Sequence, residues 1–179
     1  DSGIGSVQAL KGKSLCYADE TSTTGYRLPR SAMRKAGLNP DKDLGGAVPS
    51  GNHMQVLRDL LAGKCDVGGV YSGVYQTAAQ SGVPTAQLRI LAVTGRVPQD
   101  SVTAGPAVSA ADKQLMQEAL LKFDPKLHLG SADLGELEKI SGFVKGSDGD
   151  YASIRAILEE EAPLAPPGSG RTIPADQAP

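Results

Sequence analysis

The sequence predicts an α/β fold built around a parallel sheet. Short apolar runs alternate with amphipathic segments between residues 14 and 93, and glycines close the helix-like segments. No apolar run is long enough to cross a bilayer. Each crossover should be right-handed, and ligands of such sheets bind beyond the carboxyl ends of the strands.

The first strand is expected over 14–18, after an incoming loop over 1–10. A helix should follow from about residue 26 to 36, because apolar residues recur on one face there. Gly37 is a typical left-handed helix terminator. The members of that apolar face are Leu28, Ala32, Met33 and Ala36.

A weak second strand is expected over 46–51. Asn52 is a good N-cap for a helix over 53–62, which Gly63 closes. The apolar stripe of this helix consists of Met54, Leu57, Leu60 and Leu61.

The third strand is expected over 65–71, and its glycines at positions 68 and 69 indicate close approach by another backbone. A short helix over 73–81 should end at Gly82. Residues 88–93 are the clearest strand of all by pattern, and they would complete a four-stranded sheet.

The second half changes character. Residues 95–105 are extended and punctuated by proline, and 162–179 are a Pro- and Gly-rich tail or linker. Between them we expect a helix over 110–123 capped by Ser109, a short helix over 133–140 and a last helix from about Asp150. The inward faces are predicted to be Leu115, Met116, Ala119, Leu120 and Phe123, and then Tyr151, Ile154, Ile157 and Leu158.

A cluster of hydroxyl side chains stands where the first strand gives way to a helix, in Thr21-Ser22-Thr23-Thr24-Gly25. Backbone N–H groups at a helix start have no partner inside the helix and lie at its positive end. Hydroxyls add donors, so this turn suits a small oxyanion, with phosphate-like groups first. Ser and Thr are also ordinary helix caps, and a capped loop without a ligand is the alternative.

Two further side chains are candidate ligand contacts. His53 begins a helix, where it can donate a hydrogen bond to an oxyanion; the anion favours its protonated form and the helix dipole opposes it. Asp100 lies where the chain leaves the sheet, and it can accept from a protonated ligand oxygen or hold an amine. The alternatives are an exposed first-turn histidine and a turn-stabilising aspartate.

Several classes of protein are disfavoured. A net charge of −2 and the absence of tryptophan argue against a nucleic-acid surface, a polybasic membrane surface or a base-stacking platform. No G-x-S-x-G elbow surrounds Ser22, which weakens a hydrolase triad of Ser22, His53 and an aspartate, and no P-loop occurs. His53 and His128 have no ligand-spaced companions, so we expect no metal and no cofactor.

The two cysteines, Cys16 and Cys65, fall on predicted strands and form no metal motif. The favoured interpretation is that of two small buried apolar side chains. A disulfide between neighbouring strands is the alternative, where the geometry permits it.

Taken in order, these segments resemble the solute-binding proteins of phosphonate, phosphite and phosphate ABC transporters. The order and spacing carry the resemblance, which spans roughly residues 7 to 158. The matching segments are Lys11-Gly12-Lys13, Asp19 to Tyr26, Gly37 to Pro40, Ser50 to His53, Gly63 to Gly68, Leu91 to Asp100 and Asp150 to Arg155.

The resemblance implies a periplasmic-binding-protein-like (type II) fold, whose two α/β lobes close around the ligand. It implies that residues 1–93 form the second lobe, complete with its parallel sheet. Residues 94–161 would be the hinge crossing and the helical return segment of an incomplete first lobe. The family's opening part has no counterpart in this sequence, so we expect that part to have been removed, to lie on another chain, or to be absent from a fold with another use.

The resemblance also places Ser22, Thr23 and Thr24 on the phosphonyl oxygens, His53 beside them, and Asp100 at the ligand from the crossing region. Thr24 replaces the usual Ser of the family's Ser-Thr-Ser-Gly and keeps the hydroxyl. Ser72 stands near a position where some relatives carry an acid for aminoalkylphosphonates, which disfavours an amine ligand.

The function predicted in this way is binding of a small phosphorus oxyanion as the solute-binding component of an ABC transporter, and no enzymatic activity. The expected partners are the ligand and the membrane subunits of the transporter, without nucleic acid or membrane insertion. The expected location is periplasmic or extracellular, with a lipid anchor on a removed N-terminal segment as one option. The alternative is a ligand-sensing domain of a receptor or kinase with the same fold.

Overall fold

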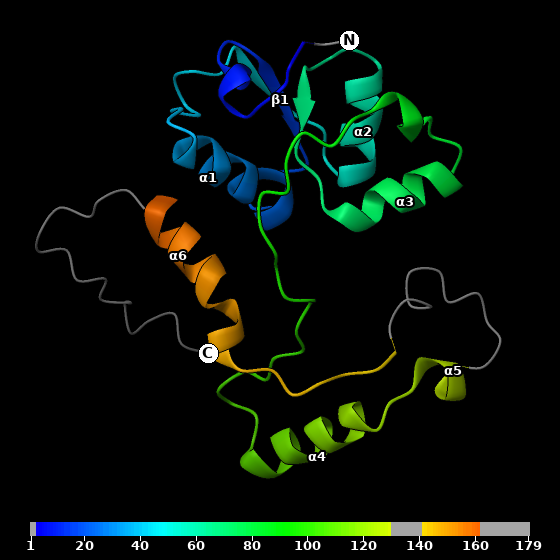
Figure 1. Ribbon diagram of the computed structural model, residues 1–179. Coiled ribbons are helices and arrows are strands. Elements are labelled where there is room, and N and C mark those ends of the chain that lie inside the picture. Colours follow the sequence, from blue (N-terminus) through cyan, green and yellow to red (C-terminus); the bar gives the residue numbers. More distant parts are fainter. Residues whose placement is uncertain (1–2, 130–140, 162–179) are drawn as a thin grey trace, which may run out of the picture. The chain divides into compact units, whose positions relative to one another are not determined.

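The computed structural model describes residues 3–129 and 141–161. The chain divides into two compact units (Figure 1): Asp1–Val97 with Ser153–Pro179, and Pro98–Ala152. The helix expected over 133–140 and the tail over 162–179 lie outside the described residues. The assignment of residues 1–93 and 94–161 to two lobes stays a prediction.

The first unit contains a three-stranded parallel sheet in the order β2-β1-β3. The strands are β1 (Ser14–Tyr17), β2 (Gly46–Pro49) and β3 (Val67–Gly68). Leu15 of the central strand pairs with Ala47 on one side and Val67 on the other. Because β1 has a neighbour on both sides and is largely buried, it is the structural centre of this unit.

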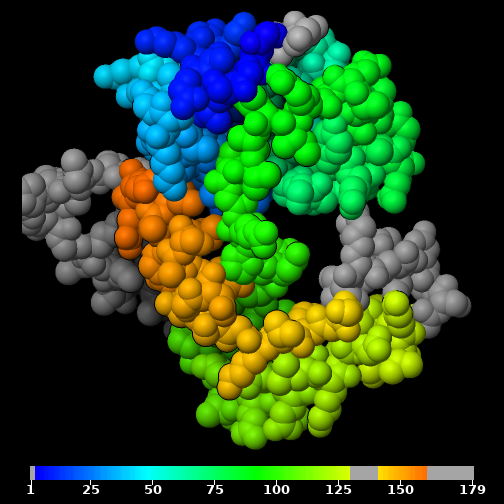
Figure 2. Space-filling model, in the orientation of Figure 1, coloured from blue at the N-terminus to red at the C-terminus, as the bar shows by residue number. Residues whose placement is uncertain are grey.

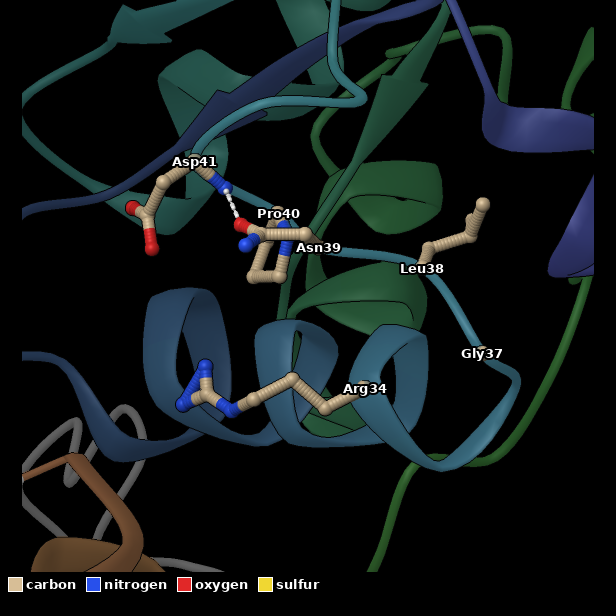
Figure 3. Close-up of a pocket in the computed structure, with 6 residues that line it drawn as sticks. All are labelled: Arg34, Gly37, Leu38, Asn39, Pro40 and Asp41. Atoms are coloured by element: carbon tan, nitrogen blue, oxygen red, sulfur yellow. Dashed lines mark hydrogen bonds between the residues drawn. The ribbon is translucent and has the colours of Figure 1, made fainter.

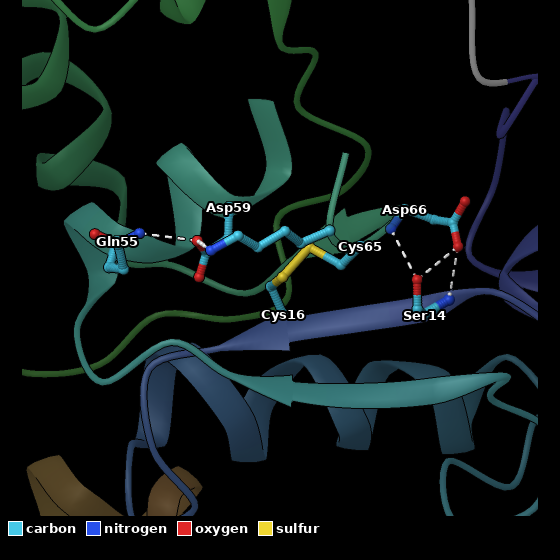
Figure 4. The surroundings of a disulfide bond; sticks show 7 residues. Ser14, Cys16, Gln55, Asp59, Cys65 and Asp66 are labelled. Carbon is cyan, nitrogen blue, oxygen red and sulfur yellow. Dashed lines mark hydrogen bonds and ion pairs between the residues drawn. A yellow bond between two sulfur atoms is a disulfide. The ribbon is translucent and has the colours of Figure 1, made fainter. Parts of the chain in front are cut away.

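Helices cover both faces of the sheet. Helix α1 (Leu28–Lys35) brings Met33 into a cluster with Ile4 and Leu10. Helix α2 (His53–Leu61) packs Val56 against Cys16 on the other face (Figure 4). Helix α3 (Ser72–Gln80) then packs on α2, and short 3₁₀ turns η1 (Gln8–Leu10) and η3 (Thr85–Gln87) flank these elements.

The predicted helix ends are confirmed by backbone geometry. Gly37, Gly63 and Gly82 have φ values of 84°, 70° and 77°, the left-handed region that favours glycine. Asn52 caps α2, because its side chain accepts a hydrogen bond from the N–H of Gln55 at 2.9 Å. Local chemistry was sufficient to place these boundaries.

The favoured interpretation of the cysteines is wrong: Cys16 and Cys65 form a disulfide (Figure 4). Strand pairing of β1 with β3 brings their Cα atoms to 5.7 Å, within the range that a disulfide spans. Both cysteines are buried in the cluster under α2. The bond therefore ties the central strand to the segment entering β3.

The predicted fourth strand is also wrong, since residues 88–93 form no ladder within the described part of the chain. Leu88 packs into the cluster of α2 and α3, whereas Leu91 packs into the cluster of α1. Ile90 and Val93 are 67% and 84% exposed. This segment passes from one apolar cluster to the other rather than extending along the sheet.

The third strand is shorter than predicted. Its ladder ends where the N–H of Gly69 donates to the carbonyl of Cys16 at 2.9 Å. A Cβ on Gly69 would lie only 2.3 Å from the carbonyl oxygen of Gly25. The close backbone approach expected at this glycine pair is thereby confirmed.

The second unit holds α4 (Ala110–Leu121), α5 (Pro125–His128) and the 3₁₀ turn η5 (Asp148–Tyr151). Ser109 caps α4 as predicted, accepting from the N–H of Asp112 at 3.1 Å. The predicted inward face of α4 is wrong, because the helix has no buried residue and Leu115 is 68% exposed. The described residues of this unit contain no sheet that could cover that face.

Helix α6 (Ala152–Glu161) returns the chain to the first unit. Ile157 is buried as predicted, whereas Leu158 is exposed. The Ser31 hydroxyl donates to Oε2 of Glu160 at 3.3 Å, which links α1 with α6. Figure 2 shows the orange atoms of α6 beside the blue atoms of α1.

Candidate functional site

Three loops leave the carboxyl ends of the three parallel strands and meet at one edge of the sheet. They comprise residues 18–22 after β1, which lead into a helical turn from Thr23, 50–52 after β2 and 69–71 after β3. In open α/β sheets this edge is where ligands bind. Four of the predicted site residues, Ser22, Thr23, Thr24 and His53, lie at this edge.

The first loop is held by Asp19. Its carboxylate accepts from the N–H of Thr21 at 2.8 Å and from the Thr21 hydroxyl, and its carbonyl accepts from the N–H of Ser22 at 3.2 Å. The Thr21 hydrogen bonds hold the pKa of Asp19 below its ordinary value. Thr21 is thus engaged in shaping the turn.

Ser22 caps a π-helical turn, η2 (Thr23–Arg27), that runs directly into α1. The prediction of an α-helix starting near Tyr26 is therefore wrong at its start. The Ser22 hydroxyl oxygen accepts from the N–H of Gly25 at 3.0 Å, and its own hydrogen remains to donate elsewhere. The N–H groups of Thr23 and Thr24 fall in the first turn, where a helix supplies no internal acceptor.

His53 begins α2 directly after its Asn52 cap. Burial lowers the pKa of His53, and the charge of Asp19 opposes that shift. Its Nδ1 is buried, and no group among the described residues hydrogen-bonds to it. Burial therefore favours the neutral form of this imidazole.

The first two loops meet at Gly25. The position that a Cβ on Gly25 would take lies 2.9 Å from the Ser22 hydroxyl oxygen and 3.0 Å from Cε1 of His53. The structure therefore brings Ser22 and His53 together, 31 positions apart in the sequence, with half-buried Thr23 and Thr24 next in the same turn. No hydrogen bond joins Ser22 to His53 among the described residues.

Sequence reasoning missed Tyr71, which it placed inside the third strand. Its ring packs edge-on with His53, with centroids 4.9 Å apart and an angle of 87° between the planes. Tyr71 is 38% exposed and lies at the start of α3. The signal that could have found it is an aromatic residue at the carboxyl end of a strand next to two glycines.

Asp100 belongs to the second unit, where it is exposed on an extended segment. Its role at a ligand stays a prediction.

A hollow of about 360 Å³ lies at the other end of α1, lined by Arg34 and residues 37–41 (Figure 3). These residues lead into the amino end of β2, so the hollow lies at the opposite edge of the sheet from Ser22 and His53. It is open to solvent and is not part of the candidate site.

Within 3–129 and 141–161, no three His, Cys, Asp or Glu side chains are grouped to hold a metal ion. Across the same ranges, every helix is too short or too polar to span a bilayer.

The fold defines a class: a mixed α/β protein with a small parallel sheet, whose strand-end loops lie at one edge of that sheet. The chain matches, over residues 1–151, the model of a family described as ABC transporter, phosphonate, periplasmic substrate-binding protein. The chain belongs to that family of phosphonate-binding substrate-binding proteins. Its members are solute-binding components of transporters rather than enzymes, and the family points to a periplasmic or extracellular location.

Proposed function

We propose that this chain binds a tetrahedral phosphorus oxyanion, a phosphonate, phosphite or phosphate, through Ser22, Thr23, Thr24 and His53. The observation that supports this most is the meeting of the Ser22 hydroxyl and the His53 ring at Gly25. Two strand-end loops distant in sequence thereby direct donors to one place.

The chemistry of these groups matches such an anion. The hydroxyl hydrogens of Ser22, Thr23 and Thr24, the N–H groups of Thr23 and Thr24 and the imidazole can each donate to a phosphonyl oxygen. Hydrogen bonds from neutral groups to an ion contribute about 1.5–3 kcal/mol each. Several such donors therefore account for specific binding without a lysine or arginine at the site.

In the proposed complex Asp100 reaches the ligand from the crossing region, and the lobes close around it. A ligand can shift the equilibrium between the open and closed forms only through its higher affinity for the closed form. Closure would present the protein to the membrane subunits of an ABC transporter. A periplasmic or extracellular location, with lipid anchoring as an option, agrees with the Cys16–Cys65 disulfide, which persists in oxidising compartments.

The test is titration calorimetry of the purified protein with phosphate, phosphite, methylphosphonate and aminoethylphosphonate. Thr23→Val and His53→Ala should each weaken binding by about tenfold to a hundredfold, because each removes one donor to the ion. The matched controls are Thr103→Val and His128→Ala, which change the same residue types in the second unit and should leave affinity unchanged. If none of the four ligands produces heat or thermal stabilisation, the proposal fails.

A further inference from the structure

The two ring nitrogens of His53 have different surroundings. Nδ1 is buried without a hydrogen-bond partner among the described residues, whereas Nε2 is not sealed off in this way. Nε2 is therefore the nitrogen through which this ring reaches solvent or a ligand.

This asymmetry selects one form of the ring. An imidazolium would bury a charge and leave an Nδ1–H donor unsatisfied, and both are costly. A neutral ring with its proton on Nε2 leaves only an unpaired acceptor at Nδ1 and keeps its donor on the accessible side. The lowered pKa of His53, caused by burial, agrees with this form.

Tyr71 is the aromatic residue that covers this imidazole. Its ring packs edge-on against His53, with the ring centroids 4.9 Å apart. Gly73 permits that arrangement, because a Cβ there would lie 2.7 Å from Cε2 of Tyr71. The absence of a side chain at Gly73 thus leaves the space that the Tyr71 ring occupies.

We propose that Tyr71 holds His53 as a neutral imidazole whose Nε2–H donates to the bound oxyanion. The part of this inference that concerns the ligand rests on the proposed function, whereas the part that concerns the protonation state of His53 in the free protein does not. Tyr71 acts here as a positioning residue, since it works through His53. The site would then bind its anion without needing a protonated histidine.

The charged group that acts on His53 is Asp19, whose carboxylate favours protonation. Asp19 is exposed and engaged with Thr21, so solvent screens its effect. Burial outweighs it in the free protein, and Tyr71 is an aromatic group packed against the ring.

The first experiment follows the histidine ring nitrogens of the free protein by ¹⁵N NMR across a pH titration. His128, the second histidine of the chain, serves as an internal reference and is assigned with His128→Gln. We expect Nε2–H on His53 and a pKa below the ordinary value in the wild type and in Tyr71→Phe, which keeps the ring. Tyr71→Ala should raise that pKa. A proton on Nδ1, an ordinary or raised pKa, or no response to Tyr71→Ala overturns the proposal.

The second experiment compares His53→Gln with His53→Asn by calorimetry with methylphosphonate. Glutamine places an N–H near the position of Nε2, and asparagine places one near Nδ1. Glutamine should retain most of the affinity, and asparagine should lose about tenfold or more. Equal losses overturn the assignment of Nε2–H as donor. If the wild type binds none of the four ligands, the proposed function fails and the part of the inference that concerns the ligand with it, while the NMR result still decides the form of the ring.

Discussion

Removing the Cys16–Cys65 disulfide should destabilise the first unit strongly. The bond closes a loop with a sequence separation of 49, and restricting an unfolded chain over that length is worth about 4 kcal/mol in the chain-entropy model. For a chain of this size that corresponds to a melting temperature lower by roughly 10–15 °C. The substitution to test is the pair Cys16→Ala and Cys65→Ala.

The measurement is urea unfolding followed by circular dichroism, with and without reductant. The wild type should become less stable on reduction, whereas the double alanine variant should not respond to reductant at all. Because the sulfur atoms are buried against Val56, the variant also loses packing, so it should be at least as unstable as the reduced wild type. Coincident unfolding curves for the oxidised and reduced wild type would refute this reasoning.

Two further predictions concern the sheet and its carboxyl edge. Gly69→Ala should lower both stability and ligand affinity, because its Cβ would meet the Gly25 carbonyl oxygen at 2.3 Å. The control is Gly105→Ala, since that position has open space around it. Unchanged unfolding and binding in Gly69→Ala would contradict the expectation. Hydrogen bonds from Lys64 and Gln55 lower the pKa of Asp59 to about 2 (Figure 4). The ionised Asp59 side chain therefore contributes stability above about pH 4, and this contribution is lost as the pH falls towards 2. Acid unfolding of Asp59→Asn should lack that component, and an identical profile to the wild type would exclude it.

The parts of the fold that depend on local chemistry were predictable from the sequence. Asn52 and Ser109 each cap the helix that follows them, because their side chains accept hydrogen bonds from free N–H groups of its first turn. Gly37 ends a helix because glycine adopts the left-handed backbone conformation at little cost. The first two strands follow from short apolar runs between turn residues. The family follows from the order of several such segments together.

The errors concern contacts between segments distant in sequence. Residues 88–93 have the composition of a strand, yet their apolar side chains are divided between two clusters. The disulfide depends on which strands are neighbours, which a single run of residues does not encode. The part that Tyr71 plays depends on Gly73 and on the meeting of two loops at His53.

The proximity of the candidate site residues was predictable only in part, for the same reason. The hydroxyl turn and His53 each carry a local signature at a strand end, and their proximity is now seen at Gly25. Asp100 lies in the other unit, so its place at the ligand stays a prediction.

The return of α6 to the first unit makes Pro98–Ala152 an insertion with both ends anchored in the same body. The buried Ile157 and the contact between Ser31 and Glu160 fasten the outgoing end. A single protease cut within the insertion therefore should leave the two fragments associated under native conditions and separate them only after denaturation.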